Sequence, residues 1–459
     1  MKCSNIQQVV NLNAIGALTA GGGKVPHTFR PWEVQTIDSI DLRDSTLGSV
    51  RYQVRGGQLR RVLPRVNDKI NGEWATDKGR YAPLDGATVQ EVRTPRISVK
   101  GNTTTWENIK LSTALQELSN RKASTVRVIY GGTTDCEGIT ALNNWCSTNG
   151  ITLETRAPVS PKDNPLTVFD ATQSDESFVP SSDQRVKGLL IGCDPRIQSP
   201  LLNLQLRERY LEGTEFYHVG SSVDLTYPVQ HIGLGSNALN RLQGQNADWN
   251  FVLVGSDLYR RDDADALLNQ VKKVTGDSKV RVCTTRTNET FIRNHAGTSA
   301  YDSNSSYDLQ FLVNITSNEV NAAGYDIVDV LGKGKTNVVI TSKGADWRKS
   351  VKLILPRLNP LETQATYVSR VGGLRRSEKI IVRNDGVLSV ANLVTELTGV
   401  IKAGKGNSQT GVKRQGKLTN APLNVGIVDY HLEGHRFAEA SATRARCSAV
   451  FAHNRTNFA

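Results

Sequence analysis

The chain has 459 residues, 38% of them hydrophobic, which is enough for two or three domains with a sizeable apolar core. No apolar run approaches the ~18 residues of a membrane-spanning helix, so any membrane association is expected to go through a partner. The net charge of +12 is compatible with nucleic acid, anionic membranes or acidic proteins as partners. No RNP-type motif, zinc finger or convincing helix-turn-helix accompanies it, so a nucleic-acid reader is disfavoured.

Six cysteines are scattered along the chain: Cys3, Cys136, Cys146, Cys193, Cys283 and Cys447. They form no CxxC pair and no Cys/His cluster with the spacing of a zinc site. The pattern argues against an iron–sulfur cluster held by this chain alone. It also indicates no disulfide framework, so a reducing compartment is the default expectation. The N-terminal residues lack the apolar core of a secretory signal and are poor in Arg for a mitochondrial presequence.

In chain order, residues 1–35 are expected to be a lead-in and residues 36–92 a small β-rich unit. Two alternating runs, SVRYQV and QLRRVL, are joined by Gly56 and Gly57, which predicts a tight hairpin. The stretch 59–86 has no periodic apolar face, which argues against a core helix. It combines Trp74 and Tyr81 with several charges, and the residues alone favour a loop clamped by ion pairs and aromatic side chains.

Between residues 93 and 400, short β-branched runs alternate with segments of helical character. Strands are predicted at 125–130, 188–192, 214–219, 250–255, 309–315, 337–341 and 351–355, and helices at 137–149, 200–211 and 261–274. The last helix contains Asp262 and Asp263, which suit a helix start. This alternation predicts an α/β class with layered parallel sheets.

Residues 401–459 open with a Gly/Lys/Ser/Gln-rich stretch that is typical of a linker and end in a segment expected to dock. The last 59 residues carry nine Lys or Arg and three acidic residues, so half of the net charge lies in this basic tail. Such a tail is more often a solvated or partner-docking arm than a nucleic-acid reader.

Blocks along nearly the whole chain resemble, in the same order, the large iron–sulfur subunit of respiratory complex I. In the small unit the matching residues are Arg61, Leu63, Pro64, Arg65, Ile70, Asn71, Glu73, Trp74, Asp77, Lys78, Arg80, Tyr81, Asp85 and Gly86. Further matches lie at 11–41, 192–207, 220–233, 355–373 and 429–450. That family belongs to the wider group of molybdopterin oxidoreductases. The resemblance implies a small β-rich unit of the Mo/W bis-MGD type, followed by Rossmann-like α/β domains of molybdopterin-oxidoreductase type.

The resemblance also marks a crevice at the end of the strand predicted at 188–192. In molybdopterin enzymes the loop equivalent to Gly192, Pro195 and Arg196 lies against a nucleotide phosphate. Here we expect these residues, with Asp224, to be the remnant of that crevice and to cap the sheet. Asp224 and His231 resemble an acid/base pair, but no nucleophile stands beside them, so a structural Asp–His hydrogen bond is the better interpretation. We expect no catalytic residue on this chain.

The chain departs from the family at the residues that bind the metal centres. The family's cysteine that provides the fourth ligand of a [4Fe–4S] cluster falls on Asn13, and an amide is a poor substitute for a thiolate. Active relatives place a Cys, selenocysteine or Ser on molybdenum in the region matching 152–183, which contains no Cys here. We therefore expect no metal and no cofactor on this chain, with the clusters on partner subunits that include a separate cluster-bearing N-terminal half.

These resemblances imply a non-catalytic structural subunit of mitochondrial complex I, on the matrix side of the inner membrane. It would brace the peripheral arm that carries electrons from NADH to ubiquinone, with other peripheral-arm subunits as partners, no nucleic acid, and membrane contact only through the complex. The rival from the enzyme class is an active molybdopterin-dependent oxidoreductase, which molybdenum and pterin analysis would reveal. A nucleic-acid protein is suggested only by the pI of about 9.4.

Overall fold

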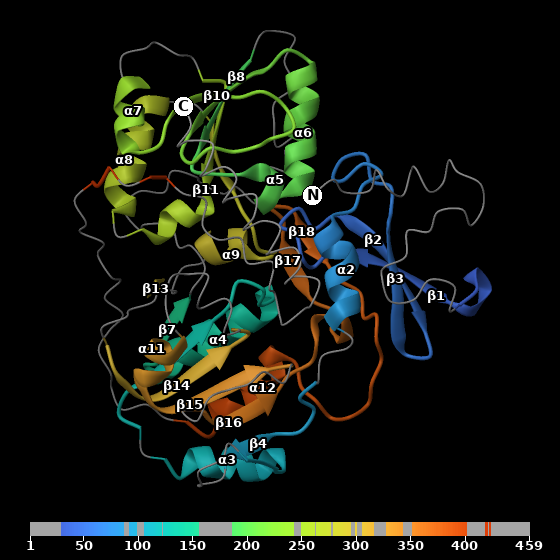
Figure 1. Ribbon diagram of the computed structural model, residues 1–459. Coiled ribbons are helices and arrows are strands. Elements are labelled where there is room, and N and C mark those ends of the chain that lie inside the picture. The colour runs from blue at the N-terminus through green and yellow to red at the C-terminus, as the bar shows by residue number, and fades with distance from the viewer. Residues whose placement is uncertain are drawn as a thin grey trace.

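The computed structural model describes residues 29–86, 91–98, 105–121, 123–155, 186–242, 249–261, 263–276, 279–294, 299–300, 305–315, 327–342, 351–401, 418–420 and 422–423. Asn13, Cys3, most of the region 152–183 and most of the basic tail therefore lie outside the described residues. Three units make up the described chain: a five-stranded parallel sheet at the top of Figure 1, an eight-stranded mixed sheet at the bottom and a small antiparallel sheet at the right between them. Within the described parts, no helix has the length and apolar character needed to cross a bilayer.

The small unit is a three-stranded antiparallel sheet preceded by a short helical turn. Its elements are η1 (Pro31–Glu33), β1 (Gln35–Ile40), β2 (Ser49–Arg55) and β3 (Gln58–Pro64). The predicted hairpin is confirmed, because Gly56 and Gly57 connect β2 to β3 with φ of 57° and 71°, the backbone that such two-residue turns require. Its core also takes in Ile380 and Ile381 from far along the chain.

The expectation of a loop in the polar part of 59–86, after the hairpin, is wrong for its last part. Residues Asp77–Gly86 form helix α2, although they present no apolar stripe. Tertiary contacts hold the helix start instead: the Thr76 hydroxyl accepts from the Gly79 amide (2.9 Å) and donates to Asp41 (3.0 Å). A polar helix of this kind escapes a search for apolar periodicity.

The five-stranded sheet is parallel throughout. Its strands are, in spatial order, β10 (Gln230–Gly233), β9 (Glu215–Val219), β8 (Lys187–Ile191), β11 (Phe251–Gly255) and β12 (Lys279–Cys283). Helix α6 (Pro200–Leu211) packs on one face, and α7 (Ser236–Leu242) and α8 (Ala264–Thr275) pack on the other. Figure 1 shows this sandwich at the top, with α6 to its right and α7 and α8 to its left.

The eight-stranded sheet is parallel except at one edge. Its order is β13 (Ser299–Ala300), β7 (Thr152–Thr155), β6 (Val126–Tyr130), β14 (Tyr307–Val313), β15 (Gly334–Thr341), β16 (Val351–Pro356), β4 (Arg96–Ser98) and β5 (Trp106–Asn108), with β4 and β5 antiparallel. One face packs against α3 (Leu111–Ser119), α4 (Cys136–Asn149) and α12 (Val390–Thr398), and the other against α11 (Ile327–Gly332). The predicted α/β class with parallel sheets is therefore confirmed.

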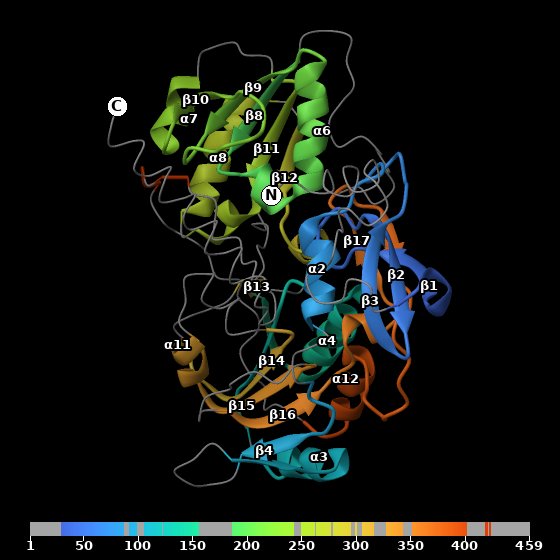
Figure 2. The same cartoon turned by 45° about the vertical axis from the view of Figure 1, so that its right-hand side comes forward.

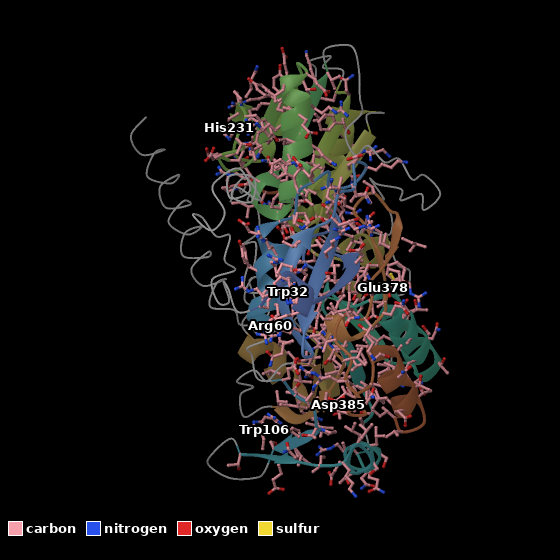
Figure 3. The ribbon with its side chains drawn as sticks, turned by 90° about the vertical axis from the view of Figure 1, so that its right-hand side faces the viewer. Trp32, Arg60, Trp106, His231, Glu378 and Asp385 are labelled. Atoms are coloured by element: carbon pink, nitrogen blue, oxygen red, sulfur yellow. The ribbon has the colours of Figure 1, made fainter. Side chains whose placement is uncertain are left out.

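Short elements fill the region where the three units meet. They are α5 (Pro195–Gln198), η2 (Ser256–Arg260), α9 (Glu289–Asn294), η3 (Pro360–Glu362), β17 (Thr366–Val368) and β18 (Leu374–Arg376). Figure 1 shows α9, β17 and α5 between the green upper unit and the teal and orange lower unit, and Figure 2 shows β17 there from a second direction. Seen from the side, His231 lies on the upper unit, Trp32 and Arg60 on the small unit, and Trp106 towards the lower end (Figure 3).

Candidate functional site at the junction of three units

The five-stranded sheet has its topological switch point between β8 and β11, where strand order reverses and α/β sheets commonly bind ligands. Gly192 follows β8 with a φ of 56°, a backbone that favours glycine. Gly255 ends β11, and a Cβ built on it would overlap the Gly192 carbonyl. The two strand ends therefore touch each other at the point where a ligand of this fold class would enter.

Side chains of the loop after Gly192 bind one another. Asp194 caps α5 by accepting from the Ile197 amide (3.3 Å), and its own amide donates to Gln198 Oε1 (3.0 Å). Gln198 in turn donates to Asp257 (3.3 Å), which follows β11. Burial is the main cause that raises the pKa of Asp194 to about 6. The loop thus spans the switch point with its own hydrogen bonds.

The structure brings together the four residues predicted for this crevice. Arg196, beside the buried Pro195, donates through Nη1 to the Asp224 carboxylate (2.5 Å) and to the Asp224 carbonyl (2.8 Å). Gly192 lies at the start of the same loop. The guanidinium that the resemblance assigned to a phosphate is therefore paired with an acidic side chain of the chain itself.

The expected Asp224–His231 hydrogen bond is wrong. His231 donates through Nε2 to the Gly220 carbonyl (2.8 Å), while Asp224 is the partner of Arg196. The His231 ring stacks on the buried His218 with centroids 5.8 Å apart. Burial and the neighbouring His231 lower the pKa of His218 to about 4, so His218 is neutral near pH 7.

The eight-stranded sheet has a second switch point, between β6 and β14. Asn314 follows β14 with a φ of 54° and donates to the Thr134 hydroxyl (3.2 Å), which donates to the Gly131 carbonyl (2.9 Å). A Cβ on Gly132 would lie 2.6 Å from Cδ of Arg286. The strand ends of this sheet are thus covered by a side chain from the segment that links the two α/β units.

That linking segment, residues 284–289 (TTRTNE), is the part of the site that the sequence analysis missed. Asn288 donates to the Thr134 carbonyl (2.8 Å) and accepts from the Val368 amide (3.0 Å). Within the segment, the Thr285 amide donates to Glu289 (2.9 Å). In the sequence this segment is marked only by being a polar run directly after an apolar strand. Such runs are common in α/β proteins, so the pattern does not identify a junction between units.

The small unit contacts the same segment through its β1–β2 connection and α2. Three hydrogen bonds connect them: Ser45 Oγ to the Thr284 carbonyl (2.8 Å), Thr287 Oγ1 to the Leu42 carbonyl (2.7 Å) and Lys78 Nζ to the Thr285 carbonyl (3.2 Å). All three units therefore meet on residues 284–289.

Buried charges gather at this meeting point. Asp41 is 1% exposed, and burial first, then the neighbouring Asp44, raises its pKa to about 6. Burial lowers the pKa of Lys78, while Asp44 and Asp41 act in the opposite direction. Arg370 donates through Nη1 to Thr46 (2.9 Å), in the small unit. The buried carboxylates, cations and hydroxyls of this cluster are thus placed to pair with one another, as buried charges between domains require.

Arg370 also connects the small unit to the five-stranded unit. Beyond Thr46, its guanidinium donates to Ser199 (3.1 Å) and Gln205 (2.6 Å), and its amide donates to the Ser45 carbonyl (2.8 Å). Burial is the main cause that lowers its pKa, to about 10, so Arg370 stays charged near pH 7.

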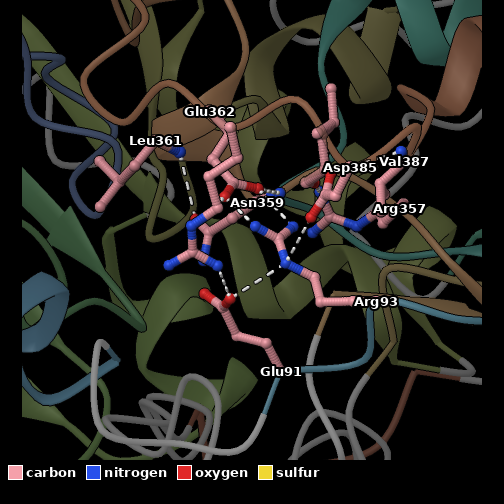
Figure 4. Close-up of polar contacts among 10 residues, drawn as sticks. Glu91, Arg93, Arg357, Asn359, Leu361, Glu362, Asp385 and Val387 are labelled. Atoms are coloured by element: carbon pink, nitrogen blue, oxygen red, sulfur yellow. Dashed lines mark hydrogen bonds and ion pairs between the residues drawn. The ribbon is translucent and has the colours of Figure 1, made fainter. Parts of the chain in front are cut away.

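A second charged cluster lies at the border of the small and eight-stranded units (Figure 4). Glu362 has a 1% exposed side chain and receives both terminal nitrogens of Arg93, one at 2.9 Å. Arg383 lies 3.5 Å from Glu362 and pairs with Glu91, while Arg93 Nε is 3.2 Å from Asp385. Bidentate pairs of this kind are geometrically specific, so this cluster is best read as a clamp between loops.

Comparisons with known proteins agree with this architecture. The family model described as molybdopterin oxidoreductase matches residues 102–383, more than half of the chain. The chain belongs to the molybdopterin oxidoreductase family. A second model, described as the NADH-ubiquinone oxidoreductase NDSU1/NuoG-like 4Fe-4S domain, matches residues 34–83.

Curated relatives carry the name that the resemblance suggested. The chain is 26% identical to the NADH-ubiquinone oxidoreductase 75 kDa subunit of Reclinomonas americana, over 81% of this chain and 57% of that protein. It is 30% identical to the mitochondrial 78 kDa subunit of Candida albicans (57% and 38%) and to that of Neurospora crassa (58% and 37%). The chain thus spans about half or less of the length of these relatives.

Among solved structures, the acetylene hydratase from Pelobacter acetylenicus has a TM-score of 0.54 at 10% identity, covering 80% of this chain and 69% of that one. At this identity the likeness concerns the fold alone. It confirms the predicted arrangement of a small β-rich unit with layered α/β domains.

The expectation of no cofactor on this chain has to be corrected. A family model described as a 4Fe-4S domain matches residues 34–83, and this finding overturns the expectation that the chain carries nothing of a cluster-binding domain. Residues 34–83 themselves contain no cysteine. Among the described residues, no group of three or more His, Cys, Asp or Glu side chains is arranged to hold a metal ion.

The residues of the crevice contact one another within the chain. Gly192 and Gly255 abut, Arg196 is paired with Asp224, and a Cβ on Gly220 would lie 2.6 Å from the Leu423 carbonyl.

Proposed function

We propose that this chain is a subunit of mitochondrial NADH-ubiquinone oxidoreductase, respiratory complex I. Its work there is structural: it braces the peripheral arm on the matrix side of the inner membrane. The observation that carries the proposal is its similarity, over 81% of its length, to a 75 kDa subunit of that enzyme.

The geometry supports a bracing role because the groups at the junction are bound to one another. Arg370 holds Thr46 of the small unit and Ser199 of the five-stranded unit, and Asn288 holds Thr134 of the eight-stranded unit. Electron transfer between clusters depends on fixed separations, so a body whose three units are joined by buried hydrogen bonds suits a support for cluster-bearing neighbours.

The proposed partners are the other peripheral-arm subunits, including one that carries the cysteine-rich N-terminal part of the relatives. The chain's matches cover 57% of the Reclinomonas protein and 38% of the Candida protein. The basic tail supplies charge for docking to acidic partner surfaces.

The test is to isolate the native complex in mild detergent and measure subunit content, iron and molybdenum per particle. Co-purification with complex I subunits without molybdenum supports the proposal. A free chain carrying stoichiometric molybdenum would overturn it and establish an active molybdopterin oxidoreductase, which is the alternative that family membership favours. The iron content separately measures whether the 4Fe-4S-type domain is loaded.

A further inference from the structure

After residues 402–417, which lie outside the described residues, the chain returns as a short extended segment. We call residues 418–423 the strap; all but residue 421 are described. Figures 1 and 2 show the strap, in red, beside α8 of the five-stranded unit. Ile401 belongs to the core of the eight-stranded unit and Leu423 to that of the five-stranded unit, so the chain crosses between units here.

The strap ends in a fully buried apolar residue held by main-chain hydrogen bonds. Leu423 is 0% exposed, donates its amide to the Leu234 carbonyl (2.8 Å) and accepts from the Ser221 amide (3.2 Å). Ser221 follows β9 and Leu234 follows β10, so Leu423 inserts between the ends of two strands. The Leu423 carbonyl can lie close to Gly220 only because Gly220 has no Cβ.

The other end of the strap is bound by the ion pair between Arg261 and Asp263. Thr419 donates through both its amide (3.0 Å) and its hydroxyl (2.7 Å) to one carboxylate oxygen of Asp263. Arg261 holds that carboxylate at 2.7 and 2.9 Å and also donates to the Pro422 carbonyl (3.2 Å). Arg261 is the main cause that keeps the pKa of Asp263 well below its usual range, so the acceptor stays ionised.

The middle of the strap caps a helix. The Asn420 side chain accepts from the Asn237 amide (3.0 Å), and the Thr419 carbonyl accepts from the Ser236 hydroxyl (3.0 Å). Both contacts lie at the start of α7, where amides need acceptors. The surface therefore meets the strap with a carboxylate at Thr419, a helix amide and a hydroxyl at Asn420 and Thr419, and an apolar core cluster at Leu423.

We propose that the carboxyl edge of the five-stranded sheet is a binding site for an extended peptide, and that its ligand is the strap. Main-chain pairing beside β9 and β10 supplies affinity, while Leu423 and Thr419 supply specificity, as in recognition by strand addition. The ligand of this edge, beside β9 and β10, is thus a peptide segment. The inference goes beyond the proposed function and does not rest on it.

The experiment starts from the folded full-length chain and breaks the covalent connection between the strap and the rest of the protein. A site for a specific protease is placed within residues 402–417, the folded chain is cut, and retention of the C-terminal fragment is followed by size-exclusion chromatography. The wild-type fragment is expected to stay bound. Leu423→Asp removes the buried contact and is expected to raise the dissociation rate about 100-fold.

The matched control is Leu418→Asp, in the same strap but at a side chain that is 40% exposed, and it is expected to retain the fragment. Hydrogen exchange of the Ser221 amide, measured on the uncut chain, gives a second readout: it should rise with Leu423→Asp and not with the control. If Leu423→Asp prevents folding, Thr419→Val takes its place, with an expected increase in dissociation of about tenfold. Release of the wild-type fragment, or its retention by the Leu423 and Thr419 variants, would overturn the proposal.

Discussion

At the scale of single residues, the start of α2 depends on one glycine and one buried carboxylate. A Cβ built on Gly79 would overlap the Asp41 carboxyl group, and Asp41 is 1% exposed. The helix can lie this close to β1 only because position 79 has no side chain. The contact explains how a polar segment without an apolar stripe becomes a helix.

Gly79→Ala is therefore expected to lower the free energy of unfolding by about 3 kcal/mol, because the Asp41 side chain or the helix has to move. Urea denaturation followed by circular dichroism measures this. Gly399→Ala is the matched control, since a Cβ there meets nothing within 4 Å, and it should change stability by less than about 0.5 kcal/mol. Equal stability of the Gly79 and Gly399 variants would contradict the packing argument.

Asp41 also predicts a pH dependence. Its pKa is raised from 3.8 to about 6 in the folded chain, mainly by burial, so the folded state binds the proton more tightly than the unfolded state. Its contribution to stability is full below about pH 4 and is lost as pH rises through about 6, by up to ~3 kcal/mol. Unfolding free energies of wild type and Asp41→Asn should diverge across this window in favour of the variant. The exposed Asp68→Asn should follow wild type; parallel curves for all three would refute the assignment.

At the scale of elements, the eight-stranded sheet carries a buried polar ladder across four neighbouring strands. Arg127 of β6 lies 3.4 Å from Glu154 of β7 and donates to Gln310 of β14 (3.0 Å). Gln310 donates to Asn337 of β15 (3.1 Å), which donates to the Leu331 carbonyl (2.8 Å). Arg127 and Gln310 are register partners, as are Gln310 and Asn337, so the ladder fixes how these strands align.

Arg127→Met should lower the free energy of unfolding by about 3–5 kcal/mol, because it removes the cation facing the buried Glu154. The double variant Arg127→Met/Glu154→Leu should recover most of this loss, since both charges are then gone. Equilibrium denaturation of the two single variants and the double variant forms the cycle. A double variant as unstable as Arg127→Met would show that the ladder acts through something other than this charge pair.

Local signals explain which elements could be predicted. Pro200 starts α6 where expected, and the Gly56–Gly57 turn sits where the alternating runs meet. Asp263 was expected to start a helix and does stand at the N-cap of α8, but its carboxylate binds Arg261 and Thr419 and makes no cap hydrogen bond. The position followed from local propensity, whereas the partner depended on a residue 156 positions away.

At the scale of the whole molecule, the three units are joined through few side chains from distant parts of the sequence. Arg370 reaches Thr46 in the small unit and Ser199 and Gln205 in the five-stranded unit. It follows β17, an element of the junction. Its removal should loosen the docking of the units without disturbing the sheets themselves.

Arg370→Met is thus expected to raise hydrogen exchange at least about tenfold around Thr46 and Ser199, with little change at Ile129 in the eight-stranded sheet. Hydrogen exchange with mass spectrometry measures both regions in one experiment. Arg376→Met, at an exposed position on β18, serves as the control and should leave all three regions unchanged. A uniform increase that includes Ile129 would mean that Arg370 supports global stability and not docking.

By itself, the sequence determined the α/β class, the resemblance to a complex I subunit and seven strands of the two large sheets, β6, β8, β9, β11, β14, β15 and β16, whereas β7, β10 and β12 were not predicted. These follow from short-range signals, because buried parallel strands need β-branched apolar runs and tight turns need glycine. Only the tertiary structure decided that α2 is helical, that residues 284–289 join three units, and that Asp224 binds Arg196 rather than His231. Each of these depends on polar groups whose partners lie far along the chain. Such contacts leave no periodic pattern in the sequence, so the sequence does not reveal which partner a polar residue will have.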